Sequence, residues 1–223
     1  MTHVRGSQAR TERKTVISNE EFENMLTRAE EIEDTFFRSR AKALLSLLRL
    51  TGKRRGEIAN VELEGVKIEN EFLNVTFTLE KKRKGHVLSK QATKSIPLTD
   101  PLTQPLLDFI GYLKRLDPTP KYLFPRVKSV FGTNVILSDA HIHGRQVFNV
   151  FRSCSKEAWP HLCRETCAAD VIKSDPTIIG AFKVQRRLDL KDFRTGFNYL
   201  RRFASDVIRR EIEKVEKNET VSA

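Results

Sequence analysis

Two observations predict a mainly α-helical fold with a small antiparallel three-stranded β-sheet, which is an α+β class. Apolar residues recur at helical spacing over most of the chain, for example within residues 35–50 and 101–116. Only residues 61–98 change period, because apolar and polar residues alternate there as in a half-buried strand. The chain has 223 residues and 39% hydrophobic content, which is enough to bury the core of one large domain.

The N-terminal half begins with two predicted helices. Ser18 and Glu21 stand three residues apart as a capping box, so a helix is expected to start there. The second helix is expected from about Thr35 to Leu50, and Gly52 ends it as a C-cap. A tight turn and a short helix follow over residues 51–58.

The predicted sheet lies between these helices and the rest of the chain. Its strands are expected at residues 66–68, 73–79 and 95–98. The second and third strands enclose a basic hairpin loop at residues 81–86. Charged hairpin loops are usually solvated and have no specific function. Because this chain has a large net positive charge, a loop that reaches into a DNA groove is at least as good an interpretation.

The C-terminal half is predicted to be helical. Helices are expected over residues 101–116, 145–157 and 161–172, with a short one after Asp175-Pro176-Thr177 and a last one from about Asp192 to Val215. Residues 126–142 show no clear pattern and are expected to form a loop. The expected organisation is a flexible basic arm at residues 1–17, one domain over residues 18–215 and a polar tail at 216–223.

The composition narrows the classes of function. The chain has 40 Lys and Arg residues against 29 Asp and Glu, so its net charge is +11. This balance indicates a polyanionic partner, with nucleic acid first and an anionic membrane surface second. No apolar run is long enough to span a membrane, and the N-terminus lacks a signal-peptide core. Three closely spaced cysteines favour a reducing, cytosolic setting, and buried packing is a better explanation for them than a metal site.

One stretch, residues 161–199, carries side chains suited to phosphate chemistry. His161 and Arg164 lie one helical turn apart and can point at one target. The arginine can fork onto two phosphate oxygens, the histidine can donate one more hydrogen bond, and the hydroxyl of Tyr199 can attack. The alternative is that Tyr199 packs on the last helix. The other two tyrosines, Tyr112 and Tyr122, lie in apolar segments that precede His161.

A second pair upstream allows a similar interpretation. Arg54 and Glu57 also lie one turn apart, in the tight turn over residues 51–58. One interpretation is an ion pair on the surface. The other is that the turn presents a buried Arg54, which Glu57 orients. No acidic cluster has metal-ligand spacing, which disfavours a two-metal nuclease and agrees with a metal-free reaction.

Taken in order, these segments resemble the three boxes of the tyrosine recombinases, or integrases. Thr51-Gly52-Lys53-Arg54-Arg55-Gly56-Glu57-Ile58 resembles the first-arginine box T-G-x-R-x-x-E. Pro160-His161-Leu162-Cys163-Arg164 resembles the H-x-x-R box, and Thr195-x-x-x-Tyr199 resembles the box of the nucleophile. Each motif is weak alone, but their order, with the basic hairpin between them, is specific. The resemblance covers roughly residues 18–210.

The resemblance implies a role for each matched residue. Arg54 and Arg164 would hold the scissile phosphate, and Glu57 would support the site around Arg54. His161 would hydrogen-bond the phosphate and assist proton transfer, and Tyr199 would form a 3′-phosphotyrosyl bond. A hairpin lysine would act as general acid on the leaving 5′ oxygen. Lys82 is the favoured candidate over Lys81, Lys84 and Lys90.

The sequence departs from the family at one position. The family usually has His or Trp nine residues before the nucleophile, where this chain has Leu190. Lys191 and Arg187 are candidates to supply the missing phosphate contact, and the alternative is that either contacts a phosphate of the DNA backbone. The residues expected to contact DNA are Lys81, Arg83, Lys84, Lys90, Arg145 and Arg187.

The expected function is a site-specific DNA recombinase or integrase that needs neither metal, cofactor nor ATP. Its implied partners are double-stranded DNA and further copies of itself, in a transient homo-tetramer. No membrane role is expected, and the expected location is the cytoplasm, on the nucleoid. Family members usually carry a separate DNA-binding domain where this chain has only residues 1–17. Two alternatives remain open: a DNA-binding remnant that does not cleave, and relaxation of DNA as by a type IB topoisomerase.

Overall fold

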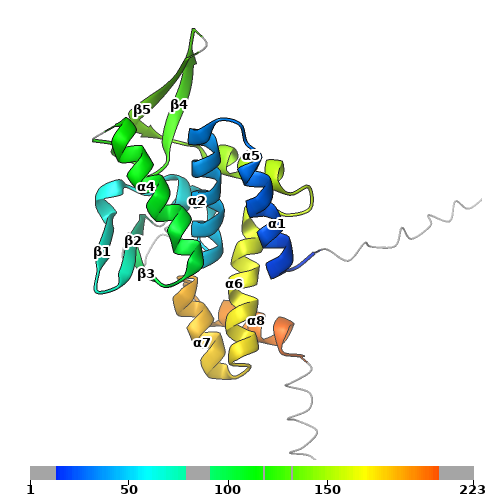
Figure 1. Cartoon of the computed structure of the whole chain (residues 1–223). Helices are drawn as coiled ribbons and strands as arrows, with labels where there is room; N and C mark the ends of the chain where they lie inside the picture. The colour runs from blue at the N-terminus through cyan, green and yellow to red at the C-terminus, as the bar shows by residue number, and fades with distance from the viewer. Residues whose placement is uncertain (1–13, 79–90, 118, 132, 206–223) are drawn as a thin grey trace, which may run out of the picture.

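The computed structural model describes residues 14–78, 91–117, 119–131 and 133–205. Figure 1 shows a helical body around α2, with a hairpin projecting at one end and α7 and α8 at the other. The helices are α1 Asn19–Glu30, α2 Thr35–Thr51, α3 Arg55–Ala59, α4 Gln104–Leu116, α5 Gly144–Cys154, α6 Pro160–Ser174, α7 Ile178–Arg187 and α8 Phe193–Phe203. The strands are β1 Val66–Glu69, β2 Phe72–Thr78, β3 Gln91–Pro97, β4 Pro125–Val130 and β5 Thr133–His141. Short 3₁₀ turns lie at Leu63–Gly65 and Pro101–Thr103.

The predicted ends of the first two helices are confirmed. The Ser18 hydroxyl accepts a hydrogen bond from the Glu21 amide at 3.1 Å, which satisfies one free N–H at the start of α1. Gly52 ends α2 in the left-handed conformation, with φ of 60°. A Cβ on Gly52 would also lie 2.7 Å from Cδ2 of Leu188, so only glycine fits this turn.

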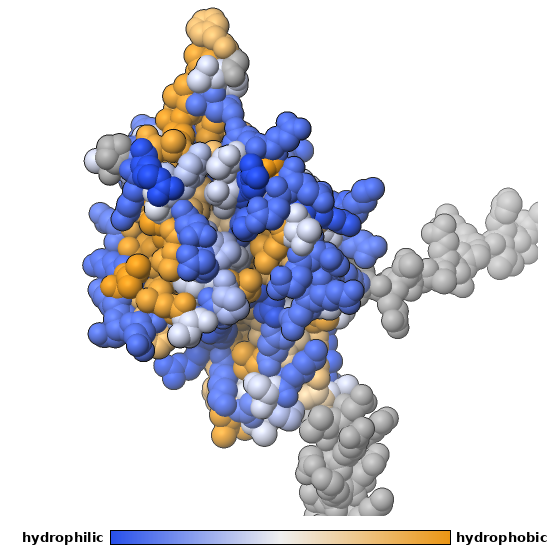
Figure 2. Space-filling model, in the orientation of Figure 1, coloured by the Kyte–Doolittle hydropathy of each residue, from blue (hydrophilic) through white to orange (hydrophobic). Residues whose placement is uncertain are grey.

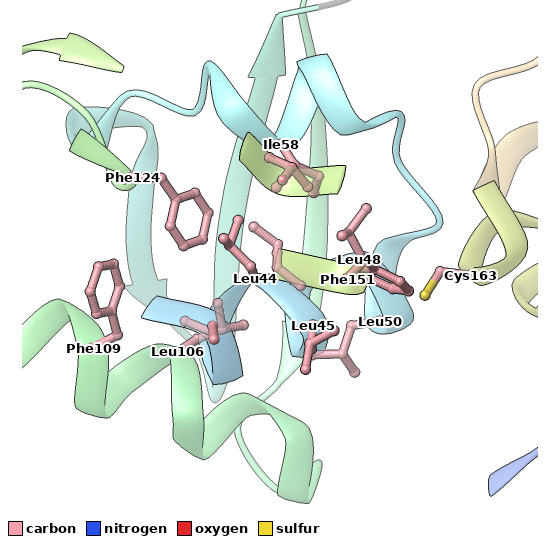
Figure 3. Packing of buried hydrophobic residues seen from close by; sticks show 14 of the residues in the cluster. Leu44, Leu45, Leu48, Leu50, Ile58, Leu106, Phe109, Phe124, Phe151 and Cys163 are labelled. Atoms are coloured by element: carbon pink, nitrogen blue, oxygen red, sulfur yellow. The ribbon is translucent and has the colours of Figure 1, made fainter. Parts of the chain in front are cut away.

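The core is built around α2. Most of that helix is buried, and apolar side chains from five other helices pack against it. Figure 3 shows its leucines among side chains of α3, α4, α5 and α6. The labelled members of this cluster are Leu44, Leu45, Leu48, Leu50, Ile58, Leu106, Phe109, Phe124, Phe151 and Cys163. Burial on every side of α2 fixes the position of the turn that follows it.

The predicted three-stranded sheet is confirmed, with antiparallel order β1-β2-β3. Leu73, Val75 and Phe77 of β2 are buried, and they alternate with more exposed polar residues. The third strand is longer than predicted, because it runs from Gln91 to Pro97. The basic loop at residues 81–86 lies outside the described residues.

The prediction of a loop at residues 126–142 is wrong. The segment forms the β4–β5 hairpin, an antiparallel pair with a register shift at Pro125/Arg126. It projects from the body (Figure 1), and apolar side chains run along it toward an exposed tip at Phe131 (Figure 2). Because neither face of most of this hairpin packs on a core, its sequence lacks the alternation by which a strand is recognised.

The C-terminal helices form a second, smaller cluster. Side chains of α6, α7 and α8 meet there, and Leu188 and Leu200 are buried among them. Gly196 lets α8 approach α7 closely, since a Cβ on it would lie 2.5 Å from the Ala181 carbonyl oxygen. The predicted helix at 145–157 is shorter than expected and ends at Cys154. Helix α8 ends at Phe203 rather than continuing without a break, and residues 206–215 lie outside the described part.

The three cysteines are buried and make no disulfide, as the sequence predicts. Among the described helices, none is both long enough and apolar enough to cross a membrane.

Candidate active site

The turn between α2 and α3 presents Arg54 on a buried acid. Arg54 is the N-cap residue of α3, and its amide donates to Oε2 of Glu57 at 3.0 Å. Its guanidinium Nη1 donates to Oε1 of the same carboxylate at 2.8 Å. The Glu57 side chain is 1% exposed and that of Arg54 is 33% exposed. The buried carboxylate of Glu57 therefore orients Arg54, while part of the guanidinium remains accessible to an anion.

Arg164 on α6 is held more tightly. Its Nη1 donates to the carbonyl of Gly52 at 2.8 Å, and its Nη2 donates to the carbonyl of Leu188 at 2.6 Å. Burial, followed by the charge of nearby Arg54, lowers the pKa of Arg164. Two guanidiniums that repel each other in this way create a site that an anion would stabilise.

A pocket of about 260 Å³ opens beside Arg54. Arg54, Arg55 and His161 contribute its polar lining, and Phe148 and Trp159 are part of its wall. The His161 side chain is 59% exposed, so its ring is accessible to a ligand. Its Nε2 lies 3.2 Å from Oε1 of Glu165. The pocket thus gathers hydrogen-bond donors suited to a phosphate group.

Tyr199 of α8 belongs to the second cluster, and its hydroxyl contacts the residue next to Arg164. Its hydroxyl donates to Oε1 of Glu165 at 3.3 Å. Burial and the charge of Glu165 raise the pKa of Tyr199, and the charge of Arg164 opposes that rise. The hydroxyl is therefore neutral at physiological pH and needs a proton acceptor if it is to attack.

Two residues of this network were not identified from the sequence. Glu165 contacts both His161 and Tyr199, and its Oε2 forms an ion pair with Arg202. Glu165 directly follows Arg164, and Arg202 lies one helical turn beyond Tyr199. Those spacings are the only sequence signal for either residue, because neither belongs to a motif.

A pair of lysines also converges close to the arginines. Lys53 is 1% exposed and forms an ion pair with Asp189, with its Nζ 4.8 Å from the centre of the Phe77 ring. Lys94 of β3 donates to the other oxygen of Asp189 at 2.9 Å. Burial lowers the pKa of Lys53, and the contact with Asp189 opposes this shift. Nothing in the sequence indicates that Lys53 is buried.

Other candidate residues lie apart from this network or outside the described chain. Leu190 packs in the second cluster, and Lys191 is exposed at the turn before α8. Arg187 donates to the carbonyl of Leu50 at 2.5 Å, at the end of α2. Arg145 is exposed on the first turn of α5. The hairpin residues Lys81, Lys82, Arg83, Lys84 and Lys90 lie outside the described residues.

Within the described residues, no group of three or more His, Cys, Asp or Glu side chains is arranged to hold a metal ion. Cys163 and Cys167 are buried on α6, and burial raises the pKa of both thiols. Cys167 donates to the carbonyl of Arg49. Their contacts are those of packed core residues.

Solved structures of recombinases share this fold at low sequence identity. The XerH recombinase in its pre-cleavage complex with difH has a TM-score of 0.57 and 19% identity, over 86% of this chain and 52% of that chain. The XerA recombinase has 0.58 and 19%, over 84% and 60%. A λ integrase dimer bound to a COC′ core site has 0.51 and 16%, over 88% and 50%. The chain therefore spans 50% to 60% of the length of these structures.

The sequence comparisons agree with the shared fold. No curated protein matches the chain by sequence. The model of the phage integrase family matches residues 15–206, which include Arg54, His161, Arg164 and Tyr199. The chain belongs to the phage integrase family, and its fold is that of a tyrosine-recombinase catalytic domain.

Proposed function

We propose that this chain cleaves and rejoins double-stranded DNA through a covalent 3′-phosphotyrosyl bond at Tyr199. One observation carries the proposal. Arg164 donates to the carbonyl of Gly52, in the turn that presents Arg54. Its neighbour Glu165 accepts from the hydroxyl of Tyr199, although these residues come from distant parts of the chain. Packing alone gives no reason to bring two arginines together beside a tyrosine hydroxyl.

Each residue has a defined task in this reaction. Arg54 and Arg164 bind the non-bridging oxygens of the scissile phosphate and stabilise the charge that develops as Tyr199 attacks. Arginine suits this task because its planar fork stays charged and can form two parallel hydrogen bonds. Glu57 orients Arg54, and His161 donates a further hydrogen bond from the pocket.

The leaving 5′ oxygen needs a proton. We assign that step to a lysine of the β2–β3 loop, with Lys82 as the candidate. Lys94 lies on the adjacent strand β3, but its ammonium already donates to Asp189 and to the carbonyl of Arg186, so it is not the favoured general acid. Lys191 and Arg187 are the candidates for the phosphate contact that Leu190 cannot make, and we favour Lys191 because Arg187 already donates to the carbonyl of Leu50.

The reaction as proposed uses neither a metal nor ATP. The arginines supply the positive charge that a metal would otherwise provide. The tyrosyl bond conserves the energy of the broken phosphodiester, so a free 5′ hydroxyl can reverse the step. Substrate recognition then rests largely on phosphate contacts, including Arg145 and the basic loop, and binding should weaken steeply with salt.

The proposed assembly is a transient homo-tetramer on two DNA sites. Exchange of strands between two duplexes requires four cleavages, and each chain carries one nucleophile. The XerH structure is a complex with its difH substrate, and the λ integrase structure is a dimer bound to a COC′ core site. The proposed location, which follows from a DNA substrate, is the nucleoid in the cytoplasm.

Covalent capture tests the proposal. The wild-type chain is mixed with a pool of randomised duplexes that carry a nick close to the target position, so that the short cleaved strand diffuses away and the adduct accumulates. We expect a protein–DNA adduct with wild type and with the control Tyr122→Phe, and none with Tyr199→Phe. Salt-sensitive binding without any adduct would instead identify a non-cleaving DNA-binding protein. Site-independent relaxation of a plasmid would identify a topoisomerase.

A further inference from the structure

Glu165 is the buried centre of a small network around the nucleophile. The residue is 8% exposed, and both of its carboxylate oxygens have partners. Oε1 accepts from the Tyr199 hydroxyl at 3.3 Å and lies 3.2 Å from Nε2 of His161. Oε2 pairs with the guanidinium of Arg202. Glu165 is thus the side chain onto which the attacking hydroxyl already directs its proton.

On the basis of the proposed function, we propose that Glu165 is the general base that takes the proton of Tyr199 during cleavage and returns it during rejoining. The Tyr199 Oη–P bond forms as the P–O5′ bond breaks. The phenolic proton passes to Oε1 of Glu165, and the leaving O5′ takes a proton from the cationic general acid. In the reverse step, protonated Glu165 donates to the departing tyrosyl oxygen while the attacking 5′ hydroxyl returns its proton to the deprotonated general acid.

The charge state of Glu165 suits this role. Burial alone would raise the pKa of its carboxyl, but the hydrogen bond from His161 and the charge of Arg202 outweigh burial and lower the pKa. Glu165 is therefore a carboxylate at neutral pH and is free to accept a proton. The phenol needs such an acceptor, because its own pKa is raised.

A weakly basic carboxylate is adequate for an attack on phosphorus. The phenol becomes far more acidic as its oxygen bonds to the phosphorus, so proton transfer becomes favourable within the step. Protein kinases use an aspartate in the same way, to accept the proton of the attacking hydroxyl.

The other charged groups around Tyr199 are poor proton acceptors. The guanidiniums of Arg164 and Arg202 carry only N–H donors and have no acceptor atom. His161 faces the pocket as well as Glu165, and binding of a phosphate there would draw its Nε2–H toward the anion. Loss of that hydrogen bond would make Glu165 more basic at the moment when the substrate is in place.

The test compares Glu165→Gln with wild type on a nicked duplex captured as described above. Glutamine keeps the size of the side chain and an oxygen that can accept the hydroxyl's hydrogen bond, but it cannot hold the proton. We expect cleavage to slow by about 10²- to 10⁴-fold, which is the usual contribution of a general base. Asp170→Asn is the matched control, because it removes another Arg-paired carboxylate from the same helix. That variant should cleave at the wild-type rate.

A second substrate separates this role from effects on the leaving group. Sulfur in place of the bridging 5′ oxygen leaves without a proton, so it should restore variants that lack the general acid but not Glu165→Gln. An unchanged or faster rate in Glu165→Gln, or full restoration by sulfur, would overturn the inference. If Glu165→Gln does not fold in a thermal melt, Glu165→Asp takes its place. That variant should be at least about ten-fold slower and not restored by sulfur, and a wild-type rate would overturn the inference.

The two proposals fail in different ways. Absence of an adduct with wild type overturns the proposed function and this inference together. An adduct that depends on Tyr199 but not on Glu165 leaves the proposed function intact and overturns only the assignment of the base.

Discussion

The guanidinium of Arg164 donates to the Leu188 carbonyl oxygen at 2.6 Å, which ties helix α6 to the turn after α7. Nη1 of the same guanidinium donates to the carbonyl oxygen of Gly52 at the end of α2. Arg164 therefore links the main core to the smaller cluster that carries Tyr199. Its position depends on both, and so does its distance from Tyr199.

Arg164→Lys should therefore strongly reduce both DNA cleavage and stability, although lysine keeps the positive charge. One ammonium cannot reach both carbonyls and also present a fork to a phosphate. We expect the rate of adduct formation to fall by roughly 10²- to 10³-fold, as when one preorganised donor is removed from an active site. The free energy of unfolding should fall by about 1–3 kcal/mol, because buried carbonyls lose a charged donor. Arg115→Lys on α4 is the control and should change neither capture nor urea denaturation.

Asp189→Asn should destabilise the chain, because it leaves Lys53 buried without a charge partner. The expected loss is about 3 kcal/mol, at the lower end for a buried pair, since the Asp189 side chain is 23% exposed. A double-mutant cycle with Lys53→Met, measured by urea denaturation, checks the assignment. In the Lys53→Met background the second change should cost much less. Equal costs in both backgrounds would show that the pair makes no specific contribution.

Gly196→Ala should force α7 and α8 apart. The new Cβ would lie 2.5 Å from the Ala181 carbonyl oxygen, which belongs to the backbone of α7 and cannot turn aside. Overpacking of this kind costs about 1–3 kcal/mol and should lower the melting temperature. Gly111→Ala on α4 is the matched control, because the nearest atom to its Cβ would be the end of the Arg115 side chain at 3.8 Å. It should stabilise the helix by about 0.5–1 kcal/mol.

Cys163→Ala should change how stability depends on alkaline pH. Burial holds the pKa of the Cys163 thiol well above its usual value, so the folded state retains a proton that the unfolded state releases. The contribution of this thiol is complete below its unfolded pKa of about 8.5 and is lost progressively as pH rises toward the folded pKa. The gap in unfolding free energy between wild type and Cys163→Ala should narrow by about 1.4 kcal/mol per pH unit above that point. It should stay constant between pH 6 and 8, and a constant gap up to pH 10 would contradict the assignment.

The parts of the fold that the sequence predicts are those with a local physical cause. Ser18 and Gly52 mark helix ends because their own chemistry satisfies the backbone there. The β2 strand is recognisable because one of its faces packs on the core. The β4–β5 hairpin escapes recognition because it projects from the body and buries little, and its exposed residues follow no period.

The candidate site likewise contains residues that the sequence identifies and residues that it does not. Arg54, His161, Arg164 and Tyr199 lie in motifs that can be recognised along the chain. Glu165 acquires its contacts with Tyr199 and Arg202 only when α6 and α8 pack together. Asp189 meets Lys53 and Lys94 only when the turn after α7 packs against the α2–α3 turn and β3. No pattern along the chain marks a carboxylate whose partners are 34 or 136 residues away.

The most direct test of the account is to identify the residue that carries the DNA. The captured adduct of the wild-type chain is digested with nuclease and protease, and the peptide that retains a nucleotide is sequenced by mass spectrometry. The account predicts a nucleotide attached through its 3′ phosphate to Tyr199. Attachment at Tyr112 or Tyr122, or through a 5′ phosphate, would contradict it.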